Sequence, residues 1–507
     1  MTDDSKPAGP DLTKGVLLKD FVDGKLLGHV GDDPVLLVQL GPDVVAIDAL
    51  CSHYHGPLAD GLVAGETVRC PWHHACFSLR TGEAVRAPAF NALATWLVES
   101  EQNKIVVRRK RAAPKATPRP ASGVPDKVVI VGGGAAGFAA AEMLRREGFS
   151  GAITMVSDDD AAPVDRPNLS KDYLAGSAPE DWVPLRPDSF YADSGIDLRL
   201  KTHVTSINPR GRSVALATGD IMPFDRLLLA TGAKPVRLDI PGADQPHVHS
   251  LRTFADSRAI IAGAGGAKRA LVIGASFIGL EVAASLRARG LEVHVVAPDR
   301  RPMERVLGPE MGDFVRSLHE QHGVVFHLED TVVQIDGKRA LLKSGALLDA
   351  DLIVVGIGVR PRLALAEQAG LAVDRGVTVD AFLETGAPGI FAAGDIARWP
   401  DPRSGANIRV EHWVVAERQG QAAACNMLGL REAFDAVPFF WSQHYDLPIN
   451  YVGHAEQWDE ISIDGNIAAR DCLLQYKSRG RVLALASIYR DLANLEAELA
   501  MEQKAKR

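Results

Sequence analysis

The chain has 507 residues, of which 46% are hydrophobic and 24% are charged, and its formal net charge is -8. This length predicts about three or four globular domains, because single hydrophobic cores stop growing beyond about 250–300 residues. The negative charge excludes an overall basic field for nucleic acid, and the five cysteines are too few for a disulfide framework. Residues 1–11 lack the apolar core of a signal peptide, and no apolar run is long enough to span a membrane, so we expect a cytoplasmic protein without membrane contact.

Residues 12–110 consist of short β runs separated by turn signals, which predicts a small antiparallel all-β domain. Within it, Cys51-Ser-His53 and Cys70-Pro-Trp-His73 each place one thiol and one imidazole on a tight loop. Two cysteines and two histidines can together bind a metal centre. A structural zinc ion is one alternative for this donor set, and four hydrogen-bonded loop residues without a metal are another.

The two motifs, CSHYHGPLADG and CPWHHACFSLRTGEA, resemble those of the Rieske [2Fe-2S] family, and the resemblance covers the whole domain. It implies that Cys51 and Cys70 bind one iron of the cluster and that His53 and His73 bind the other. Imidazole ligands raise the reduction potential of such a cluster above that of an all-cysteine cluster.

Residues beside the two motifs have no ligand role in this resemblance. We expect His55 and His74 to be solvated, or at most to support the ligands. Gly56 and Trp72 stand where respiratory Rieske proteins have the cysteines of an extra disulfide. Their presence indicates the ferredoxin-like type of lower potential, and Pro88 resembles the proline of the loop that covers the cluster.

Residues 111–126 are rich in proline and basic side chains. We interpret them as a solvated, semi-rigid linker that can reach on the order of 40 Å. Such a linker is long enough to let the first domain dock on the next one.

Residues 127–147, KVVIVGGGAAGFAAAEMLRRE, run from a buried strand through glycines into an alanine-rich helix, which is the order that a dinucleotide site requires. Gly132 permits the tight turn, Gly134 lets the backbone approach a pyrophosphate, and Gly137 lets the helix pack closely on the strand. The N–H groups at the start of the helix then face the anion. The next predicted strand ends before Asp158 and Asp159, and Asp158 is our candidate for binding a ribose hydroxyl.

Two further buried strands end in small or polar residues, RLLLATG at Thr231-Gly232 and IFAAGD at Gly394-Asp395. Together with the first glycine-rich turn and PVDRPNLSKDYL, they resemble the FAD-dependent pyridine-nucleotide oxidoreductases, in the branch of ferredoxin reductases and apoptosis-inducing-factor-like proteins. The resemblance implies an FAD-binding domain in two pieces, residues 127–250 and 366–430.

The same resemblance assigns side chains to the flavin. It implies that Asp395 bonds the ribityl chain, that Arg166 and Lys171 lie along the cofactor, and that Lys171 is near the flavin N5. Arg166 in a surface ion pair and Asp395 as a helix N-cap are the alternatives. His412 and Trp413 begin a helix whose N-terminus points at the flavin in this family, and the alternative for Trp413 is core packing.

Residues 251–365 contain a second strand, turn and helix with Gly274, Ser276 and Gly279, which predicts an NAD(P)-binding domain inserted between the two FAD pieces. Ser276 replaces the middle glycine and is small enough to admit a pyrophosphate. Glu281 matches a family glutamate that approaches the flavin and pairs with the lysine matched to Lys171; a surface charge is the alternative.

The nucleotide preference stays open between NADH and NADPH. The position after the second strand of this unit is Ala297 rather than an acid, and Arg300, which follows shortly, would suit a 2′-phosphate. We set aside two other glycine pairs, at positions 263 and 265 and at positions 356 and 358, because neither opens a helix after a strand.

Residues 431–507 resemble the small α/β interface domain of the family, closed by a charged helix over residues 492–506. This implies packing on the flavin domain, in a monomer or a homodimer. We expect Trp441 and Tyr445 to pack in its core. No cysteine lies between Cys76 and Cys425, which excludes a redox disulfide beside the flavin.

The predicted fold is therefore multidomain: an all-β Rieske domain, two interleaved α/β Rossmann-like domains and a small α/β domain. The predicted function is an oxidoreductase that passes electrons from NAD(P)H through FAD to the fused [2Fe-2S] cluster. The acceptor stays open, since an oxygenase, another ferredoxin, a cytochrome or dioxygen would fit. A redox sensor of the apoptosis-inducing-factor-like type, or an NAD(P)H oxidase with a structural metal module, is the alternative.

Overall fold

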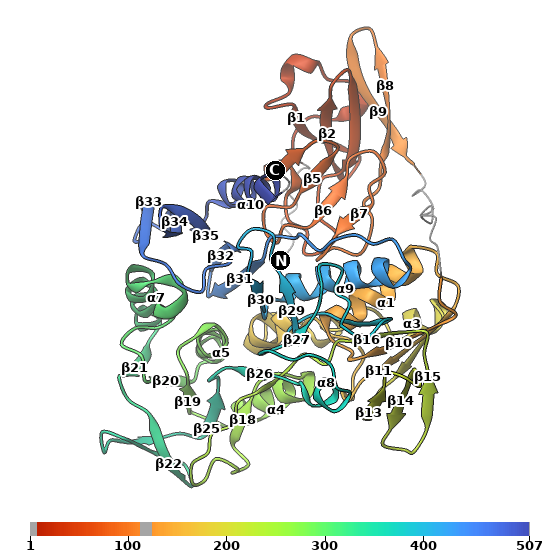
Figure 1. Ribbon diagram of the computed structural model, residues 1–507. Coiled ribbons are helices and arrows are strands. Elements are labelled where there is room, and N and C mark those ends of the chain that lie inside the picture. The colour runs from red at the N-terminus through yellow and green to blue at the C-terminus, as the bar shows by residue number, and fades with distance from the viewer. Residues whose placement is uncertain (1–7, 112–123, 506–507) are drawn as a thin grey trace. The chain divides into compact units, whose positions relative to one another are not determined.

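The computed structural model describes residues 8–111 and 124–505, which divide into two compact units (Figure 1). One unit combines the two ends of the chain, up to Pro118 and from Arg490 onward, and the other contains the residues between them. Most of the predicted linker, residues 112–123, lies outside the described residues, as do residues 1–7 of the N-terminal segment. No helix in the described part of the chain is long and apolar enough to cross a membrane.

The unit built from the chain ends contains the predicted antiparallel β domain. Its strands form a three-stranded sheet, a four-stranded sheet and a hairpin, all antiparallel. In order, these are β1 (Lys25–Val30), β2 (Asp33–Leu40) and β3 (Asp43–Asp48); β4 (Leu62–Ala64), β5 (Thr67–Arg69), β6 (Cys76–Ser78) and β7 (Ala84–Arg86); and β8 (Trp96–Glu101) with β9 (Lys104–Lys110). Leu36 and Phe77 are fully buried in the core of this unit, together with Cys51 and Cys70.

The last helix, α10 (Asp491–Ala505), belongs to this same unit and contacts β4. We expected a closing helix here, but as a part of the domain formed by residues 431–507. The structure differs because α10 buries Leu495 and the carboxylates of Glu498 and Glu502, whose cationic partners lie in the β domain.

The central unit is organised around two five-stranded parallel sheets. The first has the order β12 (Ile196–Arg199), β11 (Ala152–Val156), β10 (Lys127–Val131), β16 (Arg226–Leu229) and β28 (Ile390–Ala392). β10 reads as a continuous apolar run because a central parallel strand is covered on both faces. Helices α1 (Ala135–Arg146) and α9 (Trp413–Met427) pack side by side (Figure 1).

The second parallel sheet has the order β18 (Val248–Ser250), β25 (Leu352–Val355), β19 (Arg269–Ile273), β20 (Glu292–Ala297) and β21 (Val324–Leu328). Helices α4 (Phe254–Ala264), α5 (Phe277–Ala288) and α7 (Pro309–Gln321) accompany it. Two glycine-rich turns, each between a central strand and a helix, confirm the two predicted Rossmann-like units.

Shorter elements complete the central unit. Two three-stranded antiparallel sheets are formed by β13 (Val204–Asn208), β14 (Ser213–Leu216) and β15 (Ile221–Pro223), and by β22 (Val332–Asp336), β23 (Arg339–Leu342) and β24 (Leu347–Asp349). The remaining short pieces are β17 (Ala233–Pro235), β26 (Val359–Pro361), β27 (Val377–Thr378), β29 (Ala397–Pro400), β30 (Asn407–Ile408), α2 (Asp172–Ala175), α3 (Ser189–Asp193), α6 (Glu304–Leu307) and α8 (Ala364–Gln368).

A five-stranded antiparallel sheet ends the central unit. Its order is β31 (Phe439–His444), β32 (Leu447–Gly453), β35 (Arg481–Ile488), β34 (Asp471–Ser478) and β33 (Glu460–Asn466). β31 contacts both α5 and α9, so this sheet reaches both dinucleotide units.

Candidate functional site

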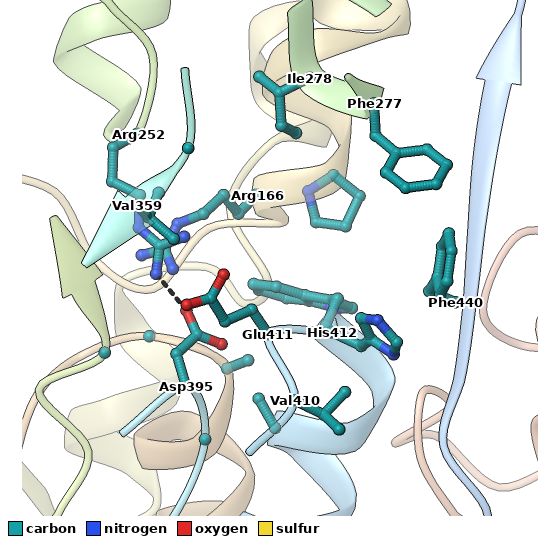
Figure 2. Close-up of a pocket in the computed structure, with 18 of the residues that line it drawn as sticks. Arg166, Arg252, Phe277, Ile278, Val359, Asp395, Val410, Glu411, His412 and Phe440 are labelled. Carbon is teal, nitrogen blue, oxygen red and sulfur yellow. Dashed lines mark hydrogen bonds and ion pairs between the residues drawn. The ribbon is translucent and has the colours of Figure 1, made fainter. Parts of the chain in front are cut away.

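A cavity of about 480 Å³ lies in the central unit where the starts of α1, α5 and α9 approach one another (Figure 2). Both glycine-rich units contribute to its wall, as a site that brings two dinucleotides together requires. The sequence-predicted residues that line it are Gly134, Arg166, Lys171, Gly232, Ser276, Glu281, Asp395, His412 and Trp413.

A second cavity of about 680 Å³ adjoins the first, since both are lined by Gly134, Arg166 and Gly232. It contains further predicted residues, namely Gly132, Asp158, Asp159 and Thr231. The two cavities together give an elongated site, which suits an extended dinucleotide.

The remaining predicted glycines act through packing and do not line either cavity. A Cβ on Gly137 would lie 1.9 Å from the carbonyl oxygen of Gly132, and one on Gly279 would lie 2.2 Å from that of Gly274. Gly132 and Gly274 have φ angles of +122° and +115°, which side chains rarely adopt. Arg300 is exposed and also lies outside both cavities.

Positive charge gathers at the start of α1. The Arg166 guanidinium lies 3.5 Å from where a Cβ on Gly134 would be, and its Nε is buried without a hydrogen-bond partner. Burial, together with the nearby Arg252, lowers the pKa of Arg166 to about 10. Arg166 is a buried cation that lies beside Arg252 and the N-terminus of α1, so a bound anion would stabilise it. The pyrophosphate of a dinucleotide is such an anion.

Two predicted acids already have partners in this site. Asp395 forms an ion pair with Arg252 at 2.6 Å (Figure 2), and the element that follows Asp395 is the strand β29 instead of a helix, so the alternative of an N-cap is wrong. Asp158 contacts His203 at 2.9 Å and Arg362 at 3.2 Å on the wall of the second cavity.

Lys171 and Glu281 form a buried ion pair at 2.8 Å, although 110 residues separate them in the sequence. Glu281 is only 2% exposed, which excludes the alternative of a surface charge. Its carboxylate also accepts hydrogen bonds from the hydroxyls of Ser170 at 2.5 Å and Ser442 at 2.6 Å. Three donors therefore fix the position of Glu281, and through it that of the Lys171 ammonium.

Helix α9 begins at the cavity with His412 as its N-cap and Trp413 as its first residue. Burial is the main reason that the pKa of His412 falls to about 3, so its imidazole is neutral. The centroid of its ring lies 4.4 Å from the ring centroid of Phe440 (Figure 2). Trp413 is half-buried and lines the cavity, so core packing alone does not describe it.

Sequence reasoning missed several residues of this cavity. Gly356 and Gly358 line it, and a Cβ on Gly274 would lie 2.3 Å from the carbonyl oxygen of Gly356. This glycine pair ends a strand without opening a helix, as expected, but it still reaches the cavity because β25 lies beside β19 and brings its end to the same edge. Trp441, expected in the core, lines the cavity 5.9 Å from the Lys171 ammonium.

The four predicted cluster ligands lie on two loops of the other unit. The buried thiols of Cys51 and Cys70 are hydrogen-bonded to each other, which lowers the pKa of Cys51 and raises that of Cys70. The rings of His53 and His73 meet edge to face, with centroids 5.1 Å apart. Burial lowers the pKa of His53 to about 3, which keeps the imidazole in the neutral form that binds metals.

The two thiols, of Cys51 and Cys70, therefore lie together, and so do the two imidazoles, of His53 and His73. This division is the one found in a Rieske centre, where two cysteines hold one iron and two histidines hold the other. Across residues 8–111 and 124–505, no three or more His, Cys, Asp or Glu side chains are gathered as a single metal ion would require. A Cβ on Gly56 would lie 2.6 Å from the Cys70 sulfur, so this position has no room for the extra cysteine of respiratory Rieske proteins.

Two expectations about the neighbouring residues have different outcomes. His55 is exposed, as expected. His74 is fully buried instead of solvated, and its Nδ1 lies 3.0 Å from Glu498 of α10. Cys76 is buried as a small packed residue, and Pro88 follows a cis peptide bond in the loop after β7.

Comparisons with known proteins agree with both parts of the structure. Residues 126–420 match the pyridine nucleotide-disulphide oxidoreductase family, and residues 17–97 match the Rieske [2Fe-2S] domain. All five cysteines lie in the described residues and are free, so the disulphide of the family name has no counterpart in this structure.

Individual relatives extend the match over almost the whole chain. Apoptosis-inducing factor 3 of Homo sapiens is 33% identical over 96% of this chain and 84% of its own length. Rhodocoxin reductase of Rhodococcus erythropolis is 38% identical over 67% of this chain and 81% of its own. The putidaredoxin reductase in a covalent complex with putidaredoxin superposes with a TM-score of 0.73 and 33% identity, over 75% of this chain and 94% of that one. The chain therefore belongs to the pyridine nucleotide-disulphide oxidoreductase family, as an FAD-dependent NAD(P)H oxidoreductase that carries a Rieske [2Fe-2S] domain.

Proposed function

We propose that this oxidoreductase takes electrons from NAD(P)H in the cavity of the central unit, passes them through FAD to the Rieske cluster of its own chain, and delivers them to a separate electron-transfer protein. The main support for the proposal is that residues of both glycine-rich units line the same cavity. A relative solved in complex with putidaredoxin supports a protein as the acceptor.

Residues at the start of α1 would hold the FAD. Arg166 would neutralise the pyrophosphate beside Gly134, Asp158 would bind the ribose, and Asp395 would bind the ribityl chain. Both acids are already oriented by arginine partners, which are Arg362 for Asp158 and Arg252 for Asp395. When bound there, FAD accepts a hydride from the nicotinamide and releases the electrons one at a time.

Lys171, Glu281 and the start of α9 would tune the flavin end of the site. The three hydrogen bonds to Glu281 keep this carboxylate against Lys171, so the ammonium cannot swing out of the cavity without leaving a buried charge unpaired. The N-terminus of α9 carries partial positive charge, which favours an anionic ring beside Trp413. Phe440 and Trp441 form apolar wall around the same point.

The second unit would bind the nicotinamide nucleotide through Gly274, Ser276 and Gly279. Ser276 lines the cavity at the start of α5. Arg301 and Arg305 are each paired with a carboxylate, whereas Arg300 is exposed and available for a 2′-phosphate.

Cys51, Cys70, His53 and His73 would bind the [2Fe-2S] cluster. A cytoplasmic location is consistent with five free cysteines. Acceptors of matching chemistry are a ferredoxin, a cytochrome or the cluster domain of an oxygenase, and the protein would work as a monomer or a homodimer.

The test is an anaerobic EPR spectrum of the purified protein before and after NADH and, separately, NADPH. We expect a rhombic Rieske signal with one nucleotide. Cys70→Ser should abolish the signal while the flavin is still reduced, and Cys76→Ala, outside the motif, should preserve it. Flavin bleaching without a cluster signal in the wild-type protein, even with a stronger reductant, would contradict the proposal.

The similarity to apoptosis-inducing factor 3 supports a second candidate, a redox sensor with slow turnover. Stopped-flow reduction separates the two. A flavin–nicotinamide charge-transfer complex that outlasts many seconds favours the sensor, and rapid decay with electrons appearing on the cluster favours the reductase.

A further inference from the structure

Helix α10 carries buried polar side chains along one face. Asn494, Glu498 and Glu502 are four residues apart, so they lie above one another on the helix. Asn494 and Glu498 are completely buried and Glu502 is nearly so, beside the fully buried Leu495. A carboxylate withdrawn from water needs charged or hydrogen-bonding partners, because its desolvation is otherwise too costly.

Three cationic or imidazole side chains of the Rieske domain contact these carboxylates. Arg69 contacts Glu498 at 3.0 Å and Glu502 at 2.7 Å. His74 contacts Glu498 at 3.0 Å, and Arg86 contacts Glu502 at 2.5 Å. All of these residues lie in one compact unit, although more than 400 residues separate the two sides of each contact.

These partners are the immediate neighbours of the second ligand loop. Arg69 directly precedes Cys70, and His74 directly follows His73. Arg86 ends β7, just before the loop that contains Pro88. One face of α10 thus holds both ends of the Cys70–His73 loop and the start of the loop expected to cover the cluster.

The first ligand loop provides an internal comparison. His55 and His74 occupy equivalent places, each four residues after a ligand cysteine, and both have a φ of +59°. This left-handed conformation is unfavourable for most residues other than glycine. His55 adopts it at the surface, whereas His74 adopts it fully buried and bonded to Glu498.

We propose that Glu498 and Glu502 are positioning residues of the Rieske cluster, which fix the Cys70–His73 loop and set the charge beside it. The proposal rests on the cluster assignment made above. Two arginines face two carboxylates in this buried group, with His74 also beside Glu498, and charges there are weakly screened. Removing one carboxylate leaves an excess positive charge, which favours the reduced and more negative cluster.

The experiment compares full-length variants by EPR-monitored redox titration, iron content and flavin absorbance. Glu498→Gln should raise the reduction potential of the cluster and change its g values. Arg86→Gln, which removes a positive charge from the same group, should lower the potential. Glu496→Gln is the matched control, because Glu496 is an exposed residue of the same helix.

The proposal is supported if Glu498→Gln raises the reduction potential, Arg86→Gln lowers it and Glu496→Gln leaves it as in the wild type. A general loss of stability would not shift the potential in opposite directions in the first two variants. Loss of iron in Glu498→Gln, with normal FAD content and with recovery in Glu498→Asp, also supports it. A potential, g values and iron content equal to wild type in Glu498→Gln overturn it. If Glu498→Gln does not fold, Arg86→Gln and Glu502→Gln decide by the same criteria. A wild-type protein without a Rieske signal would instead refute the underlying cluster assignment.

Discussion

The contact between α1 and α9 gives a quantitative prediction for Gly420→Ala. Gly420 is buried in α9, and a Cβ at this position would lie 2.2 Å from the carbonyl oxygen of Ala136 in α1. Ordinary contact begins near 3.4 Å, so the helices must separate by roughly 1 Å in a close-packed interior. Such overpacking costs about 1–3 kcal/mol, against which alanine gains up to about 1 kcal/mol over glycine in helix propensity.

We therefore expect Gly420→Ala to unfold at a lower temperature and to retain less FAD, because Ala136 lines the cavity in the first turn of the helix that we propose faces the pyrophosphate. Circular dichroism melting and the flavin-to-protein absorbance ratio after gel filtration measure both effects. Gly265→Ala is the matched control: Gly265 is exposed at the end of α4, with φ -61° and no atom closer than 3.4 Å. It should be neutral or slightly stabilising. A Gly420→Ala protein as stable and as flavin-loaded as wild type would refute this reasoning.

Three further predictions address the two sites. Lys171→Met and Glu281→Gln should each lower the free energy of unfolding by about 3–5 kcal/mol, because each leaves the other charge of the pair without its partner. In a double-mutant cycle, the loss in the double variant should be smaller than the sum of the two single losses. Burial raises the pKa of Asp165 from 3.8 to about 7. Between about pH 4 and pH 7 the folded state therefore keeps a proton that the unfolded state loses, so the free energy of unfolding should fall as the pH rises. Asp165→Asn should flatten this decline in the midpoints of urea unfolding, and an unchanged slope would contradict the prediction. His73→Cys should lower the cluster potential in a redox titration, since a thiolate replaces an imidazole, and an unchanged potential would remove His73 from the ligand set.

The glycine-rich turns could be predicted from the sequence because their geometry is local. Gly132, Gly134 and Gly137 lie within one turn and helix, and the structure gives Gly132 the positive φ and Gly137 the close approach that were expected. The pairing of Lys171 with Glu281 was reached through family resemblance, and the ion pair at 2.8 Å agrees with it.

Features that depend on distant parts of the chain escaped this reasoning. Gly356 becomes important only because β25 pairs with β19, which its own sequence does not reveal. Trp441 lines the cavity because β31 contacts α5 and α9. Glu498 and Glu502 lie in a charged helix that is typical of a solvated surface, but they are buried against Arg69, His74 and Arg86, which are far away in the sequence.

The composition of the unit that contains the Rieske loops has a consequence for biosynthesis. His74 and Glu498 are 424 residues apart, so the ribosome has made the cluster loops long before it makes the helix that supports them. At about 5–20 residues per second, the interval is on the order of 20–80 s. During this time the FAD and NAD(P) units can fold, while the Cys70–His73 loop still lacks its carboxylate partners. Iron and sulfide would thus meet a Cys70–His73 loop that has its carboxylate partners only after α10 has been made.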